Sequence, residues 1–160
     1  MRGSVEGERL SAIPGVSRLE QVRLSTITEL ARAAVERVDV LVIAGDTGAE
    51  TAEAVSVVCS AVLDAGVRYV CCWGPGCERL HALFDEAHVA REIAFNRELE
   101  LMTTGHSAES LADALAFGVR TAWPPTQVDD RRVLVVTLGD AVSAEASALL
   151  ARGAPLLDRA

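Results

Sequence analysis

The sequence predicts a three-layer α/β domain, flavodoxin-like or Rossmann-like, with a four-stranded parallel sheet and an extra N-terminal helix. Short apolar runs rich in β-branched residues alternate with helical patterns, as in βαβ units. The runs are almost continuously apolar, which is typical of strands that are buried on both faces. With 160 residues, of which 50% are hydrophobic and 24% charged, the chain fits one globular domain.

We expect a loose arm over residues 1–15, a single domain over residues 16–153 and a tail over residues 154–160. The extra helix is predicted from Ser17 to about residue 37. Ser17 and Glu20 form a capping box there, and apolar residues follow at helical spacing.

Four strands are predicted after this helix, each followed by a helix of its own. The first strand, 38–44, ends at the turn Gly45-Asp46-Thr47-Gly48, where Thr47 and Glu50 form a capping box for a helix that ends at Gly66. The others are strand 67–72 with a helix from Cys77, strand 98–103 with a helix from Ser107 to Gly118, and strand 132–138 with a helix from Gly139 to Gly153. Two strand orders remain open, 3-2-1-4 and 2-1-3-4, and only the first makes the second and third strands neighbours.

Composition excludes several classes of function. The formal net charge of −8 argues against a nucleic-acid partner, which would need a clustered basic face. No apolar run is long enough for a membrane helix. Four cysteines without an export signal predict free thiols in the cytoplasm. The expected partner is a small molecule or a protein, and a second copy of the chain would cover the edges of a short sheet.

The chemically capable residues cluster where the predicted strands end. In open parallel sheets, ligands bind outside the carboxyl ends of the strands, so this edge is the expected site. The residues that we expect there are Asp46, Trp73, Gly74, Cys77, Glu78, His81, Thr104, His106 and Glu109.

A cysteine nucleophile is one hypothesis for this edge. Cys77 lies at a helix N-terminus, which stabilises a thiolate, His106 could act as its base, and Glu109 could orient the imidazole. The neighbouring Glu78 opposes this, since its negative charge raises the thiol pKa. The pair can meet only if the second and third strands are neighbours.

Metal and nucleotide sites have less support. Cys72, Cys77, His81 and His106 could form a zinc set, but their spacing matches no standard zinc signature. The glycine-containing turns at 45–48 and 74–76 could present N–H groups to an anion, yet neither matches a nucleotide-binding motif. We therefore expect tight turns, and neither metal nor cofactor.

Two motifs carry a resemblance to a known family. The segments Trp73-Gly74-Pro75-Gly76-Cys77-Glu78 and Thr103-Thr104-Gly105-His106-Ser107-Ala108-Glu109 resemble an uncharacterised bacterial family of small α/β proteins, in which W-G-x-x-C-E precedes T-T-W-H-x-x-E. The resemblance runs from about residue 38 to 140 and implies a fold and a site but no reaction. Gly105 stands where that family usually has Trp.

The sequence leaves two classes of function open. The favoured one is a binding or regulatory module that uses the cleft at the carboxyl ends of the strands, because no complete catalytic signature is present. The alternative is a small cysteine- and histidine-dependent hydrolase with Cys77 and His106 in the cleft.

Overall fold

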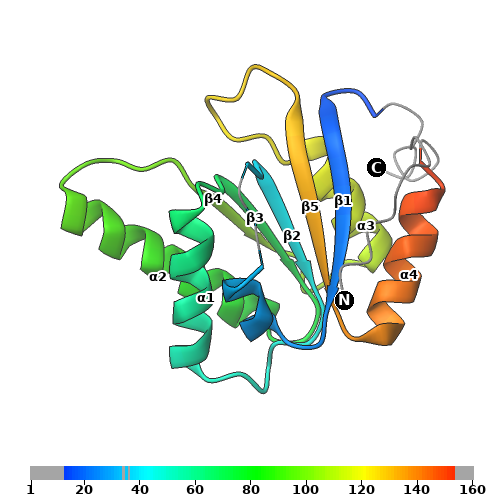
Figure 1. Ribbon diagram of the computed structural model, residues 1–160, viewed down its shortest axis with the longest axis horizontal. Helices are drawn as coiled ribbons and strands as arrows, with labels where there is room; N and C mark the ends of the chain where they lie inside the picture. Colours follow the sequence, from blue (N-terminus) through cyan, green and yellow to red (C-terminus); the bar gives the residue numbers. More distant parts are fainter. Residues whose placement is uncertain (1–12, 34, 36, 154–160) are drawn as a thin grey trace.

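The computed structural model describes residues 13–33, 35 and 37–153 and contains a parallel sheet in the order β1-β5-β2-β3-β4 (Figure 1). Every strand pair is parallel. The strands are β1 (Val16–Leu24), β2 (Val40–Ala44), β3 (Tyr69–Trp73), β4 (Met102–Gly105) and β5 (Arg131–Leu138). The α/β class with a parallel sheet is confirmed, but the sheet has five strands instead of the predicted four.

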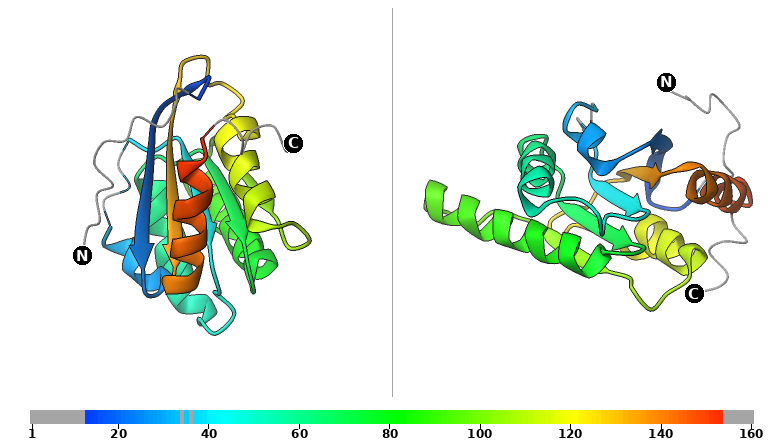
Figure 2. Two further views of the ribbon diagram at one scale, coloured as in Figure 1. Left: turned by 90° about the vertical axis from the view of Figure 1, so that its right-hand side faces the viewer. Right: turned by 90° about the horizontal axis from the view of Figure 1, so that it is seen from below.

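Helices cover both faces of this sheet (Figure 2). The α1 face carries the 3-10 helix η1 (Ile27–Ala31), α1 (Ala52–Asp64) and α2 (Cys77–Phe95). The α4 face carries α3 (Leu111–Ala116), the π-helix η2 (Phe117–Thr121) and α4 (Asp140–Ala151). From β1 to β4 the chain crosses the sheet in one direction, and from β4 to β5 it returns. Since parallel crossovers are right-handed, the reversal moves the connecting helix to the other face.

Each face has its own apolar core, because side chains alternate along the strands. On the α1 face, Leu41 and Ile43 of β2 pack against Val58 of α1 and Phe84 of α2. On the α4 face, Val40 and Val42 of β2 pack in the same apolar core as Leu115 of α3. Every residue of β2 is buried, as its continuously apolar sequence predicts.

The predicted N-terminal helix is wrong: the segment forms the edge strand β1 and the short helix η1. Residues Val16, Leu19 and Val22 are three apart, which fits one face of a helix, whereas the strand packs Leu19 on the α4 face of the sheet and Val22 on the α1 face. Pairing with β5 over eight positions decides between them, and Gln21 fixes the strand further by donating to the Ser143 carbonyl at 3.0 Å. The capping box lies instead at Thr26 and Glu29, where η1 begins.

Two other helix starts differ from their predictions. Helix α1 is capped by Thr51, whose side chain accepts a hydrogen bond from the Ala54 amide at 3.1 Å, so Thr47 belongs to the preceding turn. Helix α3 is capped by Ser110 instead of Ser107. Gly118 does not end this helix, since the chain continues through it as the π-helix η2.

The order of the four predicted strands is 3-2-1-4, the first of the two alternatives, so β3 and β4 are neighbours. The predicted tail, 154–160, and all but residues 13–15 of the predicted arm lie outside the described residues. None of the helices in the described part of the chain is long and apolar enough to cross a membrane.

Candidate functional site

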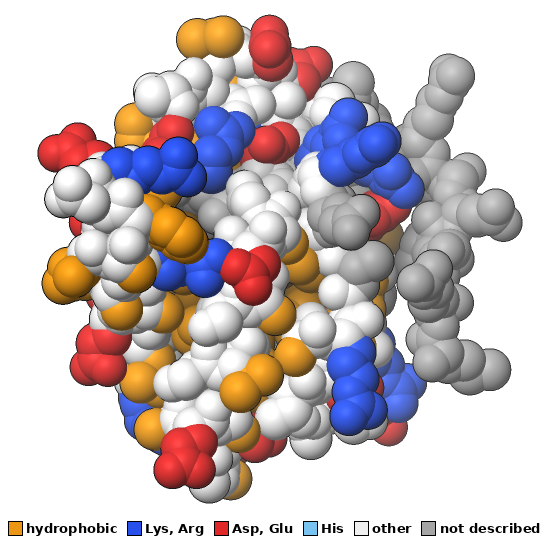
Figure 3. Space-filling model, turned by 60° about the vertical axis from the view of Figure 1, so that its left-hand side comes forward, with side chains coloured by type: hydrophobic (Ala, Val, Ile, Leu, Met, Phe, Trp, Pro, Cys, Tyr) orange, Lys and Arg blue, Asp and Glu red, His pale blue; other side chains and the backbone are white. Residues whose placement is uncertain are grey.

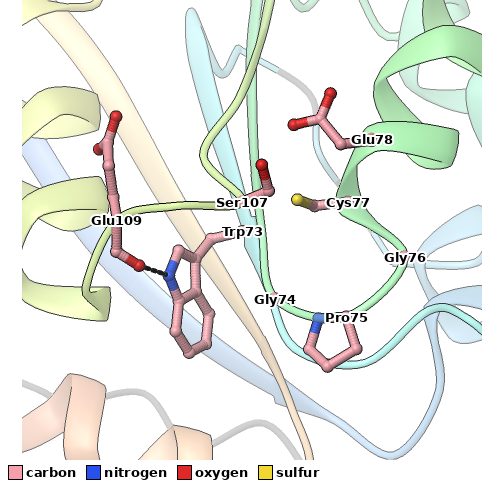
Figure 4. A pocket seen from close by; sticks show the side chains of 8 residues that line it. All are labelled: Trp73, Gly74, Pro75, Gly76, Cys77, Glu78, Ser107 and Glu109. Atoms are coloured by element: carbon pink, nitrogen blue, oxygen red, sulfur yellow. Dashed lines mark hydrogen bonds between the residues drawn. The ribbon is translucent and has the colours of Figure 1, made fainter.

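The chain leaves the carboxyl ends of β3 and β4 toward opposite faces of the sheet. Strand β3 continues into α2 on the α1 face, and β4 continues toward α3 on the α4 face. Diverging connections between neighbouring parallel strands open a crevice, which is where ligands bind in such sheets. A cavity of about 390 Å³ lies there, lined by Trp73, Gly74, Pro75, Gly76, Cys77, Glu78, Ser107 and Glu109 (Figure 4).

The two glycine-containing turns beside the crevice bind each other. The amide of Gly45 donates to the Trp73 carbonyl at 3.0 Å, and the amide of Thr47 donates to the Pro75 carbonyl at 2.9 Å. Gly74 has φ +103°, and a Cβ on it would lie 2.4 Å from the Gly45 carbonyl oxygen. A side chain at position 74 would therefore be strained and would clash with the neighbouring turn. Because the amides of Gly45 and Thr47 bind carbonyls of the neighbouring segment, the two turns hold each other in place.

Trp73 forms one wall of the cavity. Its indole N–H donates to the backbone carbonyl of Glu109 at 2.9 Å, which joins the end of β3 to the loop after β4. The Glu109 side chain turns the other way: the carboxylates of Glu78 and Glu109 both point away from the Trp73 and Pro75 rings (Figure 4). The space next to the indole is therefore bounded by rings and glycine backbone.

His106 is buried, and both nitrogens of its ring have polar partners. Its side chain is 4% exposed, Nδ1 lies 2.9 Å from a Glu109 carboxylate oxygen, and Nε2 lies 2.9 Å from the Thr104 hydroxyl. The ring also packs against Phe117, with 4.7 Å between ring centroids. Since Phe117 packs against the core of the α4 face, the imidazole of His106 lies on that face.

Cys77 begins α2 on the α1 face and is 2% exposed. Burial raises the pKa of its thiol, the backbone amide of His106 lowers that pKa and the charge of Glu78 raises it again. The net pKa shift is upward, so the thiol is protonated at neutral pH. The strand order brings the backbone of His106 to Cys77, but the imidazole and the thiol point to different faces of the sheet.

Glu78 lies over the end of β4. A Cβ on Gly105 would lie 2.7 Å from a carboxylate oxygen of Glu78, so the exposed carboxylate occupies the space that a side chain at position 105 would need. An indole at this position would require the Glu78 side chain to move. The wall that such a Trp would supply is absent here, and Trp73 is the aromatic residue of the cavity.

Four of the predicted site residues lie outside the cavity lining: Thr104 and His106, described above, and Asp46 and His81. Asp46 accepts a hydrogen bond from the Gly48 amide at 2.9 Å, which stabilises its own turn. His81 is one turn further along α2 and lies 3.3 Å from Asp85, an ion pair if the histidine is protonated. Within the described residues, no group of three or more His, Cys, Asp or Glu side chains is arranged to hold a metal ion.

Ser107 is the lining residue that the sequence analysis placed in another role. Its hydroxyl was expected to cap a helix, whereas the structure places it at the cavity beside Cys77 (Figure 4). The actual cap, Ser110, accepts from the Asp113 amide at 3.1 Å and donates to the Asp113 carboxylate at 2.8 Å. The Ser-x-x-Asp spacing of these two residues is typical of a helix start, and it could have identified Ser110 as the cap in place of Ser107.

A family model described as "Domain of unknown function (DUF7684)" matches residues 19–152. The match covers most of the chain, from β1 to the end of α4, and agrees with a resemblance to an uncharacterised family. No curated protein and no solved structure matches the chain significantly.

Proposed function

We propose a function from geometry alone, since this chain belongs to the DUF7684 family, whose description states no activity. The proposal is that the chain is a ligand-binding module that holds a small molecule in the crevice between the carboxyl ends of β3 and β4. The observation that carries it is the cavity of about 390 Å³ at the point where the two connections diverge. Cavities of this size hold small organic ligands in other proteins.

The lining supports a ligand with a flat apolar part. The indole of Trp73 is fixed by its hydrogen bond to Glu109, so a planar group could stack on it without ordering a mobile side chain. The Ser107 hydroxyl, at the edge of the cavity, can both donate and accept a hydrogen bond. The expected ligand therefore combines an aromatic or aliphatic ring with one polar group.

Two features favour binding over catalysis by a Cys77–His106 pair. The Cys77 thiol is buried and its pKa is raised, whereas a nucleophilic cysteine needs a lowered pKa. Both imidazole nitrogens of His106 already have partners, Glu109 and Thr104, on the α4 face. A hydrolase at this site would require one of these bonds to break before the imidazole could reach the thiol.

The test uses Trp73 as a reporter. In a Trp123→Phe variant Trp73 is the only tryptophan, and we expect ring-containing fragments with one polar group to change its fluorescence. Adding Ser107→Phe fills the edge of the cavity and should abolish the response. Ser56→Phe, at an exposed position on α1, is the matched control and should keep it. Fragments that act equally on the two phenylalanine variants would contradict the proposal.

Alkylation separates binding from hydrolysis. We expect Cys77 to react slowly with iodoacetamide at pH 7, at a rate that His106→Ala leaves nearly unchanged. Rapid labelling of Cys77 below pH 7 that depends on His106 would instead support the hydrolase. Resolving the labelling by mass spectrometry for each cysteine keeps Cys59, Cys71 and Cys72 as internal buried references.

A further inference from the structure

A second cavity lies at the opposite edge of the sheet, where β1 and β5 begin. It has a volume of about 340 Å³, and its charged lining residues are Arg18, Glu20, Arg37 and Arg132. Figure 3 shows basic side chains, all of them arginines in this chain, on the upper part of the molecule, the end at which β1 and β5 begin. Three cations and one carboxylate around one cavity contrast with a formal net charge of −8 for the whole chain.

Two of these arginines are held side by side by the sheet. Arg18 of β1 is the register partner of Arg132 of β5, and paired residues of neighbouring strands point to the same face. That face is the α1 face, because Val22 and Leu134, which follow at even spacing, both pack there. Like charges placed directly across a strand pair are destabilising, so this pairing needs a compensating charge.

The charges within the cavity compensate only one arginine. Arg18 forms an ion pair with Glu20. The nearby Asp39 carboxylate accepts from the Arg68 guanidinium at 3.1 Å and from the backbone amide of Arg132 at 2.8 Å, and it forms no ion pair with the side chain of Arg37 or Arg132. In the described part of the chain, the side chains of Arg37 and Arg132 form no ion pair. Two of the three arginines at the cavity therefore have no ion-pair partner among the described residues.

Arg37 is held there in a strained backbone conformation. Its φ is +63°, in the left-handed region that residues with a Cβ rarely adopt. Backbone strain of this kind concentrates at functional sites. This conformation places the third arginine at the cavity, next to Val38 at the entry to β2.

We propose that this cavity binds a phosphate-type oxyanion, either free phosphate or the phosphoryl group of a small molecule. A dianion would balance the two uncompensated charges, and guanidinium forks match phosphate oxygens with paired hydrogen bonds. A bound anion would also convert the repulsion between Arg18 and Arg132 into attraction to a shared partner. The site is separate from the crevice at the carboxyl ends, so it stands or fails independently of the function proposed above.

The test compares anions at matched ionic strength. Inorganic phosphate and glycerol 3-phosphate should raise the unfolding temperature of the wild-type protein above its value in chloride. Calorimetric titration should show that Arg132→Gln weakens phosphate binding by at least about tenfold, the effect of losing one charge-assisted contact. Arg97→Gln, which removes an exposed arginine at the end of α2, is the matched control and should bind as the wild type does.

A second readout excludes a structural role for Arg132. In chloride, Arg132→Gln should unfold at the same temperature as the wild type or slightly higher, because the repulsion from Arg18 is relieved. Tighter binding of glycerol 3-phosphate than of phosphate would indicate a phosphorylated small molecule, and the reverse would indicate the free anion. Equal binding to Arg132→Gln and Arg97→Gln, or no effect of phosphate beyond that of chloride, would overturn the proposal.

Discussion

At the carboxyl end of the sheet the thiols of Cys71, Cys72 and Cys77 are buried as neutral groups, whereas at the amino end the guanidinium of Arg131 is buried with its charge. A thiol avoids the cost of burial by keeping its proton, and so it needs no polar partner. Arginine cannot follow that route, because burial lowers the pKa of its guanidinium only from a value far above neutral pH, and the group keeps its proton. At neutral pH, burying a thiol therefore costs little free energy, whereas burying a guanidinium requires hydrogen-bond acceptors around it.

That environment is visible around Arg131. Its guanidinium donates to the backbone carbonyls of Val119, Ala122 and Gly15 and stacks on the Trp123 ring, 4.2 Å from the ring centroid. These contacts join the π-helix η2 to the beginning of β5. Arg132, one residue later, points to the α1 face and is exposed. Two adjacent arginines therefore differ completely in role, because alternation along the strand sends them to opposite faces.

Raising the pH should have the largest effect on stability, because it acts on the buried thiols and leaves the charge of Arg131 unchanged. Burial raises the pKa of Cys59 and Cys71 to about 12 and that of Cys72 well above 9.0, its value in the absence of burial. Above pH 9 the unfolded chain loses these protons while the native state retains them, so stability falls as pH rises. Each thiol should cost about 1.4 kcal/mol between pH 8 and pH 10, and the three together about 4 kcal/mol.

Urea unfolding under reducing conditions at pH 8, 9 and 10 measures this loss. The variant Cys59→Ala is the control, since it removes one titrating thiol from the apolar core and should lower the pH dependence by one proton. A stability that is constant across this range, or a slope that Cys59→Ala leaves unchanged, would show that the thiols ionise without unfolding.

The amino end should respond to substitution instead of to pH. We expect Arg131→Gln to lower the free energy of unfolding by about 3 kcal/mol, because the carbonyls of Val119 and Ala122 lose their donor inside the core. Arg132→Gln is the matched control on the opposite face and should change stability by less than about 0.5 kcal/mol. Similar losses for the two variants would mean that the buried shell around Arg131 contributes little.

The sequence predicted the carboxyl end far better than the amino end, and the reason is physical. Trp73, Gly74, Cys77 and Glu78 are nearly consecutive, and a strand followed by a glycine-containing turn and a helix can be recognised locally. The start of α2 at Cys77 follows from that local pattern, and four of the predicted residues that line the cavity come from this one segment, while Glu109 comes from the loop after β4.

Long-range pairing set the features that could not be predicted. β1 is a strand because β5 is available to pair with it, and nothing within residues 16–24 reveals that partner. The arginine cavity joins Arg18, Arg37 and Arg132, which are distant in the sequence. The separation of Cys77 from the imidazole of His106 depends on which face each side chain takes at the end of its strand, and a shift of one residue would reverse it.

The smallest expected effect concerns the hydrogen bonds from His106 to Thr104 and Glu109 at the carboxyl end of the sheet. Unlike the thiols, this buried imidazole needs polar partners. In Glu109→Ala the Nδ1 atom of His106 loses its acceptor, and we expect a loss of about 1.5 kcal/mol, the cost of an unsatisfied buried donor. Glu109→Gln keeps a carbonyl oxygen in reach and should lose less than half of that. Urea unfolding gives the stabilities, and the nitrogen chemical shifts of the imidazole report whether Nδ1 still carries the proton. If both variants are as stable as the wild type, water replaces the carboxylate, and His106 belongs with the thiols as a group that is buried at little cost.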